Sequence, residues 1–381
     1  MSIPQPTRLW LSDSRWRNLQ RPGPSILMIA LGSLAACRAG VPVAAAPGSL
    51  RNARVAVERP TPKLTMFVGE LTDAQREQLA QAAPNVTIVA GLSRAQALDR
   101  ASEAHAIDAR YATREFLDAA TQLRWIQATS AGVDRYLSLA EPISRRNIVF
   151  TNMQGAYGPA IADHVFAMVL TLSRELRYYS ERQAKAEWAR ANSDGQPFAL
   201  EGLTMLVVGL GGIGTDVAER AHGFGMRVIA TRRSDDGGPS FIEYVGKPSE
   251  LLHLLPRADV VAICVPLTPE TDKLFDARAF AAMKPGAILV NIARGKVVDT
   301  QALVGALESG KLRGACLDVT DPEPLPAEHP LWRKKNVLIT PHVAADSKLS
   351  EERAWALLRE NVRRFGVGEP LYNVVDWKAG Y

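Results

Sequence analysis

The clearest indication of the fold is the stretch Met205-Leu-Val-Val-Gly-Leu-Gly-Gly-Ile-Gly214. Its apolar start predicts a buried strand, its glycines follow the pattern G-x-G-x-x-G, and a helical pattern continues over 212–224. In such a turn the first glycine allows a tight reversal, the second lets the backbone approach a pyrophosphate, and the third lets helix and strand pack closely. The free N–H groups at the helix start face the anion. We therefore expect a dinucleotide to contact Gly209, Gly211, Gly212, Ile213 and Gly214.

Predicted strands and helices alternate on both sides of this stretch. Short apolar runs predict further strands at 63–69, 86–90, 123–127, 148–150, 227–230, 259–264, 287–290, 314–317 and 337–340. Helical patterns cover 72–83 with Thr72 as the N-cap, 157–191 as one long helix, and 349–365. Alternation of this kind is typical of parallel sheets with helices on both faces.

Length and charge exclude several classes of protein. At roughly 100–200 residues per domain, the 381 residues, 47% of them apolar, predict about two domains with sizeable cores. The net charge of +5 comes from residues 1–62, which hold eight arginines, no lysine and two acids, so the rest of the chain is near neutral. Binding to phosphate backbones needs a concentrated basic face. We therefore expect no nucleic-acid partner, and no metal, because the histidines and cysteines lack the spacing of metal ligands.

The first 46 residues have the layout of a secretory signal. Arg15, Arg17 and Arg21 precede an apolar run at 26–36, and Cys37 follows in a sequence similar to a lipoprotein box. The run is too short to cross a bilayer, which takes about 20 residues. The alternatives are a disordered extension over 1–62, or an upstream start that is not used. We favour a cytoplasmic protein, because the remaining chain needs a soluble cofactor. Export or lipoprotein anchoring through 1–46 is the alternative, with membrane contact only if Cys37 is lipidated.

The residues after the strand at 227–230 bear on which dinucleotide is bound. A carboxylate at this position accepts hydrogen bonds from a ribose 2′-hydroxyl, but the chain has Thr231, Arg232, Arg233 and Ser234 here. Guanidinium groups bind a 2′-phosphate, which a carboxylate would repel. We therefore expect NADP(H), contacted by Thr231, Arg232 and Arg233. If these arginines are only solvated turn residues, NAD(H) is the cofactor.

Several ordered motifs add to the glycine turn. They are IADHV at 161–165, VPLTPET at 265–271, NIARGKVVD at 291–299, LDVTDPEP at 317–324, TPH at 340–342 and PLYNVVD at 370–376. With them the chain, from about residue 63 to its end, resembles the D-isomer-specific 2-hydroxyacid dehydrogenases, and among them the glyoxylate/hydroxypyruvate reductase-like members. The resemblance implies an α/β fold of two Rossmann-like, doubly wound parallel-sheet domains. An NAD(P)-binding domain, 157–343, is then inserted in a substrate domain, 63–156 and 344–381.

The resemblance also implies a reaction and three catalytic residues. A small 2-oxoacid, with glyoxylate or hydroxypyruvate favoured, would be reduced by hydride transfer from the nicotinamide to the D-2-hydroxyacid. Arg294 would bind the substrate carboxylate and polarise the ketone. His342 would be the general acid/base, and Glu323 would hold the other imidazole nitrogen and fix the ring.

Other positions follow from the same resemblance. Cofactor contacts are implied at Val265, Pro266 and Thr271 on the adenine-ribose side, at Ala293, and at Asp318, which would accept from the nicotinamide carboxamide. The backbone at Ser130, Ala131, Gly132 and Val133 would bind the substrate carboxylate. Tyr111, Trp125 and Tyr157 are either pocket walls or core residues. A homodimer is expected.

A protein of another class could have the same fold. A nucleotide-sensing protein would bind the dinucleotide and a protein partner without turnover. The presence of Arg294, Glu323 and His342 argues against this alternative.

Overall fold

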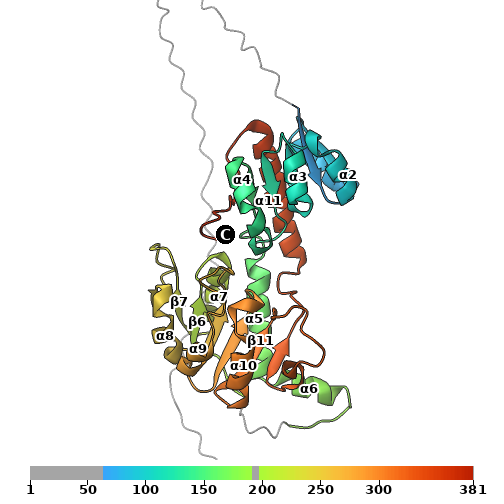
Figure 1. Ribbon diagram of the computed structural model, residues 1–381. Helices are drawn as coiled ribbons and strands as arrows, with labels where there is room; N and C mark the ends of the chain where they lie inside the picture. The colour runs from blue at the N-terminus through green and yellow to red at the C-terminus, as the bar shows by residue number, and fades with distance from the viewer. Residues whose placement is uncertain (1–62, 191–196, 381) are drawn as a thin grey trace, which may run out of the picture. The chain divides into compact units, whose positions relative to one another are not determined.

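A computed structural model describes residues 63–190 and 197–380, all within the unit Glu58–Tyr381 (Figure 1). The signal, the lipidated Cys37 and the extension predicted for residues 1–62 lie outside the described residues. Among the residues that are described, no helix is long and apolar enough to cross a membrane.

The first sheet is parallel and has five strands in the order β2-β1-β3-β4-β5. Its strands are β1 (Leu64–Val68), β2 (Val86–Ala90), β3 (Ala106–Asp108), β4 (Trp125–Gln127) and β5 (Val149–Thr151). The helices along this part of the chain are α1 (Asp73–Ala82), α2 (Arg94–Asp99), α3 (Arg114–Ala119) and α4 (Ala140–Arg145). Helix α1 begins after Thr72, whose side chain accepts from the N–H of Gln75 in a capping box, as predicted.

The second sheet is also parallel and has seven strands in the order β12-β11-β10-β9-β6-β7-β8. Its strands are β6 (Thr204–Val208), β7 (Arg227–Thr231), β8 (Tyr244–Gly246), β9 (Val260–Ile263), β10 (Ala287–Asn291), β11 (Leu312–Leu317) and β12 (Val337–Ile339). The helices are α5 (Gly158–Ser173), α6 (Leu176–Gln183), α7 (Gly212–Gly223), α8 (Leu251–Leu254), α9 (Ala277–Ala282), α10 (Thr300–Glu308) and α11 (Lys348–Val367). The strand order reverses between β6 and β9, the place where open sheets of this kind bind ligands.

Each sheet buries both of its faces. In β6, Leu206 and Val208 face a core shared with α8, α9 and α10, whereas Met205 and Val207 face a core shared with α5 and α7. In β1, Phe67 faces α2, α3 and α4, while its neighbours along the strand face α1 and α11. The second sheet lies in sequence between the first sheet and α11. The predicted fold class, with two doubly wound parallel sheets and an inserted unit, is confirmed.

The single helix predicted over 157–191 is wrong. Helix α5 ends at Ser173, and Glu175 takes a left-handed conformation with φ of 55° before α6 begins. A left-handed residue cannot continue a right-handed helical turn. The prediction missed this break because Ser173, Arg174 and Glu175 include neither glycine nor proline, the usual signals for a helix end.

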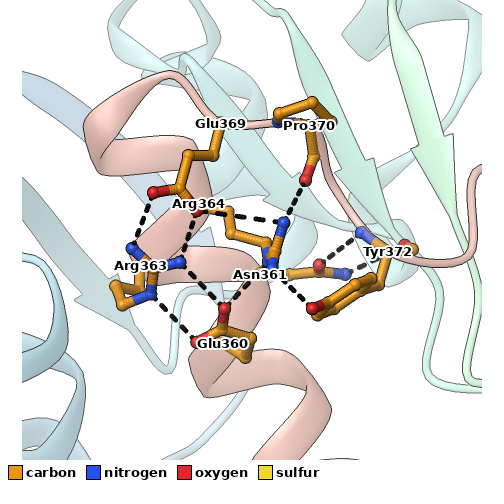
Figure 2. Close-up of polar contacts among 7 residues, drawn as sticks. All are labelled: Glu360, Asn361, Arg363, Arg364, Glu369, Pro370 and Tyr372. Atoms are coloured by element: carbon orange, nitrogen blue, oxygen red, sulfur yellow. Dashed lines mark hydrogen bonds and ion pairs between the residues drawn. The ribbon is translucent and has the colours of Figure 1, made fainter.

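Helix α11 carries the chain back to the first sheet (Figure 1). There it packs against α1. It ends at Gly368, whose φ of 73° is left-handed. Figure 2 shows how the reversal after α11 is fixed. The fully buried Asn361 donates to the carbonyl of Tyr372 and accepts from its N–H at 3.2 and 2.8 Å.

Charged side chains surround this reversal on the surface. Glu360 accepts hydrogen bonds from both Arg363 and Arg364, and Glu369 accepts from Arg363 (Figure 2). Solvent screening weakens ion pairs near the surface. The buried amide of Asn361 and the guanidinium of Arg364, which donates to the carbonyl of Pro370 at 2.9 Å, together fix the path that returns the chain to β5, where Val374 pairs with Thr151.

Candidate active site

The turn between β6 and α7 meets the steric demands of a dinucleotide site. Gly209 has a φ of 100°, and a Cβ there would lie 2.8 Å from Cγ1 of Val265. A Cβ at Gly214 would overlap the carbonyl oxygen of Gly209. By contrast, no atom lies within 4 Å of a Cβ built on Gly211 or Gly212, where α7 begins. The open helix start beside a tightly packed turn fits a pyrophosphate.

Thr231 supports this turn from the end of β7. It is buried, its carbonyl accepts from the N–H of Leu210 at 2.8 Å, and its hydroxyl accepts from the N–H of Gly209 at 3.2 Å. Thr231, predicted as a cofactor contact, thus also orders the glycine turn from the end of β7.

The loop after β7 gathers cations and carboxylates, and Nη2 of Arg232 lies 3.4 Å from Oδ2 of Asp236. Arg232 donates to the carbonyl of Gly237 at 2.8 Å, and Arg233 donates to the carbonyl of Ala379 at 3.0 Å. Lys247, which the sequence analysis missed, donates to the carbonyls of Arg233 and Ser234 at 3.2 and 3.3 Å. Its ammonium also hydrogen-bonds Asp235 and lowers the pKa of that carboxyl.

The segment that follows β9 lies against the glycine turn through Val265. It closes into its own turn, in which the hydroxyl of Thr271 donates to the carbonyl of Pro266 at 2.6 Å and accepts from the N–H of Thr268 at 2.8 Å. The structure therefore brings Val265, Pro266 and Thr271 together beside the glycine turn that is predicted to bind the pyrophosphate.

His342 and Glu323 are in contact. Nδ1 of His342 lies 2.8 Å from Oε1 of Glu323, and both side chains are 45% exposed. They follow β12 and β11, which are neighbours in the sheet. A carboxylate only accepts hydrogen bonds, so Nδ1 carries the shared proton and Nε2 is the nitrogen left to exchange one.

Arg294 follows β10, the next strand along, and reaches toward the loop after β4. A Cβ at Gly132 would overlap its Nη2, so only glycine allows the guanidinium this close. Its Nη1 donates to the carbonyl of Ala293 at 2.8 Å, while Nε and Nη2 lie 3.0 and 2.9 Å from Oδ1 of Asp134. Asp134 was not predicted, and its position two residues after Gly132 is the signal that could have revealed it.

The loop that carries Arg294 abuts the loop that carries Glu323. A Cβ at Gly295 would overlap the carbonyl group of Thr320, three residues before Glu323. The loop after β4 is fixed from its own side, because Asn152 donates to the carbonyl of Ala131 at 2.9 Å and Ser130 donates to the carbonyl of Gly132 at 2.7 Å. The structure thus places Arg294 beside Gly132, and Glu323 against His342, at the carboxyl ends of three adjacent strands.

Asp318 faces the turn that carries His342. It is 2% exposed, and its carboxylate accepts from the hydroxyl of Thr340 at 2.7 Å and from the N–H groups of Val343 and Ala344 at 2.9 and 3.0 Å. If Asp318 also accepts a hydrogen bond from the nicotinamide carboxamide, as predicted, the same two oxygens must accept it in addition to these three.

The three aromatic candidates separate into two groups. Tyr111 and Trp125 are core residues, with 3% and 0% exposure. Tyr157 precedes α5, is partly buried, and donates to the carbonyl of Thr129 at 2.5 Å, next to the loop that holds Gly132. Burial raises the pKa of its phenol.

Within 63–190 and 197–380, no three His, Cys, Asp or Glu side chains are grouped as metal ligands would be.

Comparisons with known proteins agree with this arrangement. The family model described as D-isomer specific 2-hydroxyacid dehydrogenase, NAD binding domain, matches residues 166–344. The chain is 37% identical over 269 residues to a glyoxylate reductase of Korarchaeum cryptofilum, covering 69% of this chain and 79% of that protein.

Solved structures share the fold over most of the chain. A D-isomer specific 2-hydroxyacid dehydrogenase family protein of Aeromonas salmonicida superposes with a TM-score of 0.70 and 34% identity, over 83% of this chain and 99% of that one. A D-isomer specific 2-hydroxyacid dehydrogenase of Xanthobacter autotrophicus, solved with NADPH and MES, superposes with a TM-score of 0.70 and 26% identity, over 84% and 100% of the two chains.

Proposed function

The chain belongs to the family of D-isomer specific 2-hydroxyacid dehydrogenases, and from that premise we propose that it reduces a small 2-oxoacid to the D-2-hydroxyacid with NADPH. Glyoxylate and hydroxypyruvate are the favoured substrates. The observation that carries the proposal is the pairing of His342 with Glu323 at 2.8 Å, at the sheet edge where Arg294 reaches Gly132.

Arg294 binds the substrate carboxylate. A guanidinium offers a planar fork of donors that matches a carboxylate, and such charge-assisted bonds are strong. Asp134 occupies Nε and Nη2 through one oxygen, which orients the fork but leaves further N–H protons free. The backbone of Gly132 lies against the same guanidinium, and with that of Ala131 it completes the anion site.

His342 supplies the proton that the ketone oxygen needs as it becomes a hydroxyl. Glu323 holds Nδ1, so Nε2 points its proton at the substrate, and the carboxylate balances the imidazolium charge. In the oxidation direction the same nitrogen accepts the proton.

The chain holds the dinucleotide through the glycine turn and the segments beside it. The start of α7 at Gly211 and Gly212 would leave room for the pyrophosphate, and Val265, Pro266 and Thr271 would line the adenine-ribose side. When bound, the reduced nicotinamide supplies the hydride. Arg232 and Arg233 favour NADP(H), since the loop after β7 offers guanidinium groups where a 2′-hydroxyl would need a carboxylate.

The chain works as a homodimer in this account. Helix α6 has no buried residue and exposes Leu176 and Tyr179, and Trp188 after it is also exposed. Light scattering on the full chain tests the expected mass of two copies. A monomer at micromolar concentration would contradict it.

The test of the function is a panel of 2-oxoacids with NADPH and NADH in parallel. We expect oxidation of NADPH with glyoxylate and hydroxypyruvate, a lower rate with NADH, and D-glycerate from hydroxypyruvate on chiral analysis. A protein that binds NADPH but turns over no 2-oxoacid would instead be a nucleotide-sensing protein.

A further inference from the structure

One motif residue contacts the turn that carries His342 without touching the site itself. His164 lies on α5, within the stretch IADHV. Its Nε2 is 2.9 Å from the hydroxyl oxygen of Thr340 and 3.7 Å from Oδ1 of Asp318. Its side chain is largely buried, at 21% exposure, so this contact is its main polar environment.

The direction of these hydrogen bonds follows from the groups involved. The carboxylate of Asp318 can only accept, so the hydroxyl of Thr340 gives it its one proton, across 2.7 Å. The oxygen of Thr340 must then accept from His164, whose Nε2 therefore carries a proton. The three side chains form a chain of donors that ends on a buried carboxylate.

Asp318 fixes the backbone on both sides of His342. Its carbonyl accepts from the N–H of His342 at 2.8 Å, and its carboxylate accepts from the N–H groups of the next two residues at 2.9 and 3.0 Å. His342 has a φ of 57°, in the left-handed region that a residue with a side chain adopts only when its surroundings impose it. Asp318 provides that constraint.

His164 connects this turn to the helix layer of the cofactor sheet. Helix α5 packs against α7, the helix that begins in the glycine turn. A hydrogen bond from α5 to Thr340 thus sets the position of the turn relative to the helix beside the pyrophosphate. Displacements of about 1 Å at a reacting group can cost about 100-fold in rate.

We propose that His164 is a positioning residue for proton transfer, acting through Thr340 and Asp318 on the turn that holds His342. The proposal rests on the function proposed above. It assigns no contact with substrate or cofactor to His164, and it gives the IADHV motif a role in the reaction.

The test compares variants that remove one donor with variants that keep it. Thr340→Val and His164→Leu remove a hydrogen bond at nearly constant volume, whereas Thr340→Ser and His164→Gln retain a donor. We expect the first pair to lower kcat by about 10-fold or more, with KM for the 2-oxoacid and Kd for NADPH within about twofold of wild type. The conservative pair should recover most of kcat. His253→Leu, a histidine exposed on α8, is the matched control and should leave kcat unchanged.

Several outcomes are distinguishable. A role in stability alone would lower Tm in Thr340→Val and His164→Leu without changing kcat, and would overturn the inference. If His342→Ala loses activity while these two variants keep wild-type kcat, the positioning role fails and the proposed function stands. If His342→Ala itself retains full kcat, the proposed function fails. Should either donor-removing variant not fold, Thr340→Ala and His164→Ala carry the same expectation.

Discussion

Nδ1 of His342 lies 2.8 Å from Oε1 of Glu323, although the two residues are 19 positions apart in the chain. The pairing follows from the register of two parallel strands, since Leu317 in β11 pairs with Ile339 in β12 and each site residue follows its strand. Backbone hydrogen bonds between the two strands thus place the proposed general acid and its carboxylate partner at one edge of the sheet.

Replacing the carboxylate tests its part in the pair. Glu323→Gln keeps an oxygen that can accept from Nδ1 but removes the charge that balances the imidazolium. We expect kcat to fall by about 10-fold or more, with Kd for NADPH unchanged. Glu328→Gln, an exposed carboxylate in the same loop, is the control for steady-state kinetics. Equal kcat in the two variants would remove Glu323 from the reaction.

Arg294→Lys tests whether the guanidinium of Arg294 binds the substrate carboxylate. Lysine keeps the positive charge but cannot bind a carboxylate through two parallel N–H groups or hold its place against Asp134 through Nε. We expect KM for the 2-oxoacid to rise by about 10-fold or more, the equivalent of one lost charge-assisted hydrogen bond. Steady-state kinetics with Arg278→Lys, on the exposed start of α9, provides the comparison. An unchanged KM would place the substrate carboxylate elsewhere.

Gly214→Ala tests the glycine turn. The added methyl group would overlap the carbonyl oxygen of Gly209, whereas at Gly223, at the end of the same helix, it would meet open space. We expect Gly214→Ala to weaken NADPH binding by at least about 10-fold, through displacement of the helix start from the strand. Fluorescence titration of both variants measures this. Tight binding by Gly214→Ala would show that the turn does not hold the pyrophosphate.

Arg232→Asp tests the choice of dinucleotide. The new carboxylate would repel a 2′-phosphate and accept from a 2′-hydroxyl. We expect KM for NADPH to rise and KM for NADH to fall, which lowers the NADPH:NADH preference by about 10-fold or more. Arg278→Asp is the control for the change in net charge. If the preference is the same in both variants, the 2′-phosphate is recognised by other groups.

Sequence patterns predicted the elements whose signals are local. The apolar runs of β1, β2, β6 and β9 are confirmed as strands, and Thr72 caps α1 as predicted. Strand β3 was missed because its three residues, Ala106–Asp108, are too short to show a pattern. It forms because β1 and β4 offer hydrogen-bonding partners on both sides, which is a property of the assembled sheet.

The candidate site likewise contains residues that local motifs indicate and residues whose roles arise only in the folded chain. The residue types of Arg294, Glu323 and His342 and their places after strands were available from motifs in the chain. Asp134 was not predicted, although it lies two residues after Gly132, because its partner Arg294 is 160 positions away. Lys247 was not predicted because its contacts with the carbonyls of Arg233 and Ser234 depend on how the loop after β7 folds. Asp318 was predicted as a cofactor contact, but its links to Thr340, Val343 and Ala344 depend on the path of the turn after β12, which no pattern encodes.

Whether His342 supplies the proton is tested best by the kcat of His342→Ala with NADPH and the best 2-oxoacid, alongside its Kd for NADPH. His342 is 45% exposed, so the variant should fold normally. It should also bind NADPH normally, because the glycine turn predicted to hold the dinucleotide follows β6, whereas His342 follows β12. We expect kcat to fall by about 10²–10⁴-fold with Kd unchanged. Near-normal turnover would contradict the account.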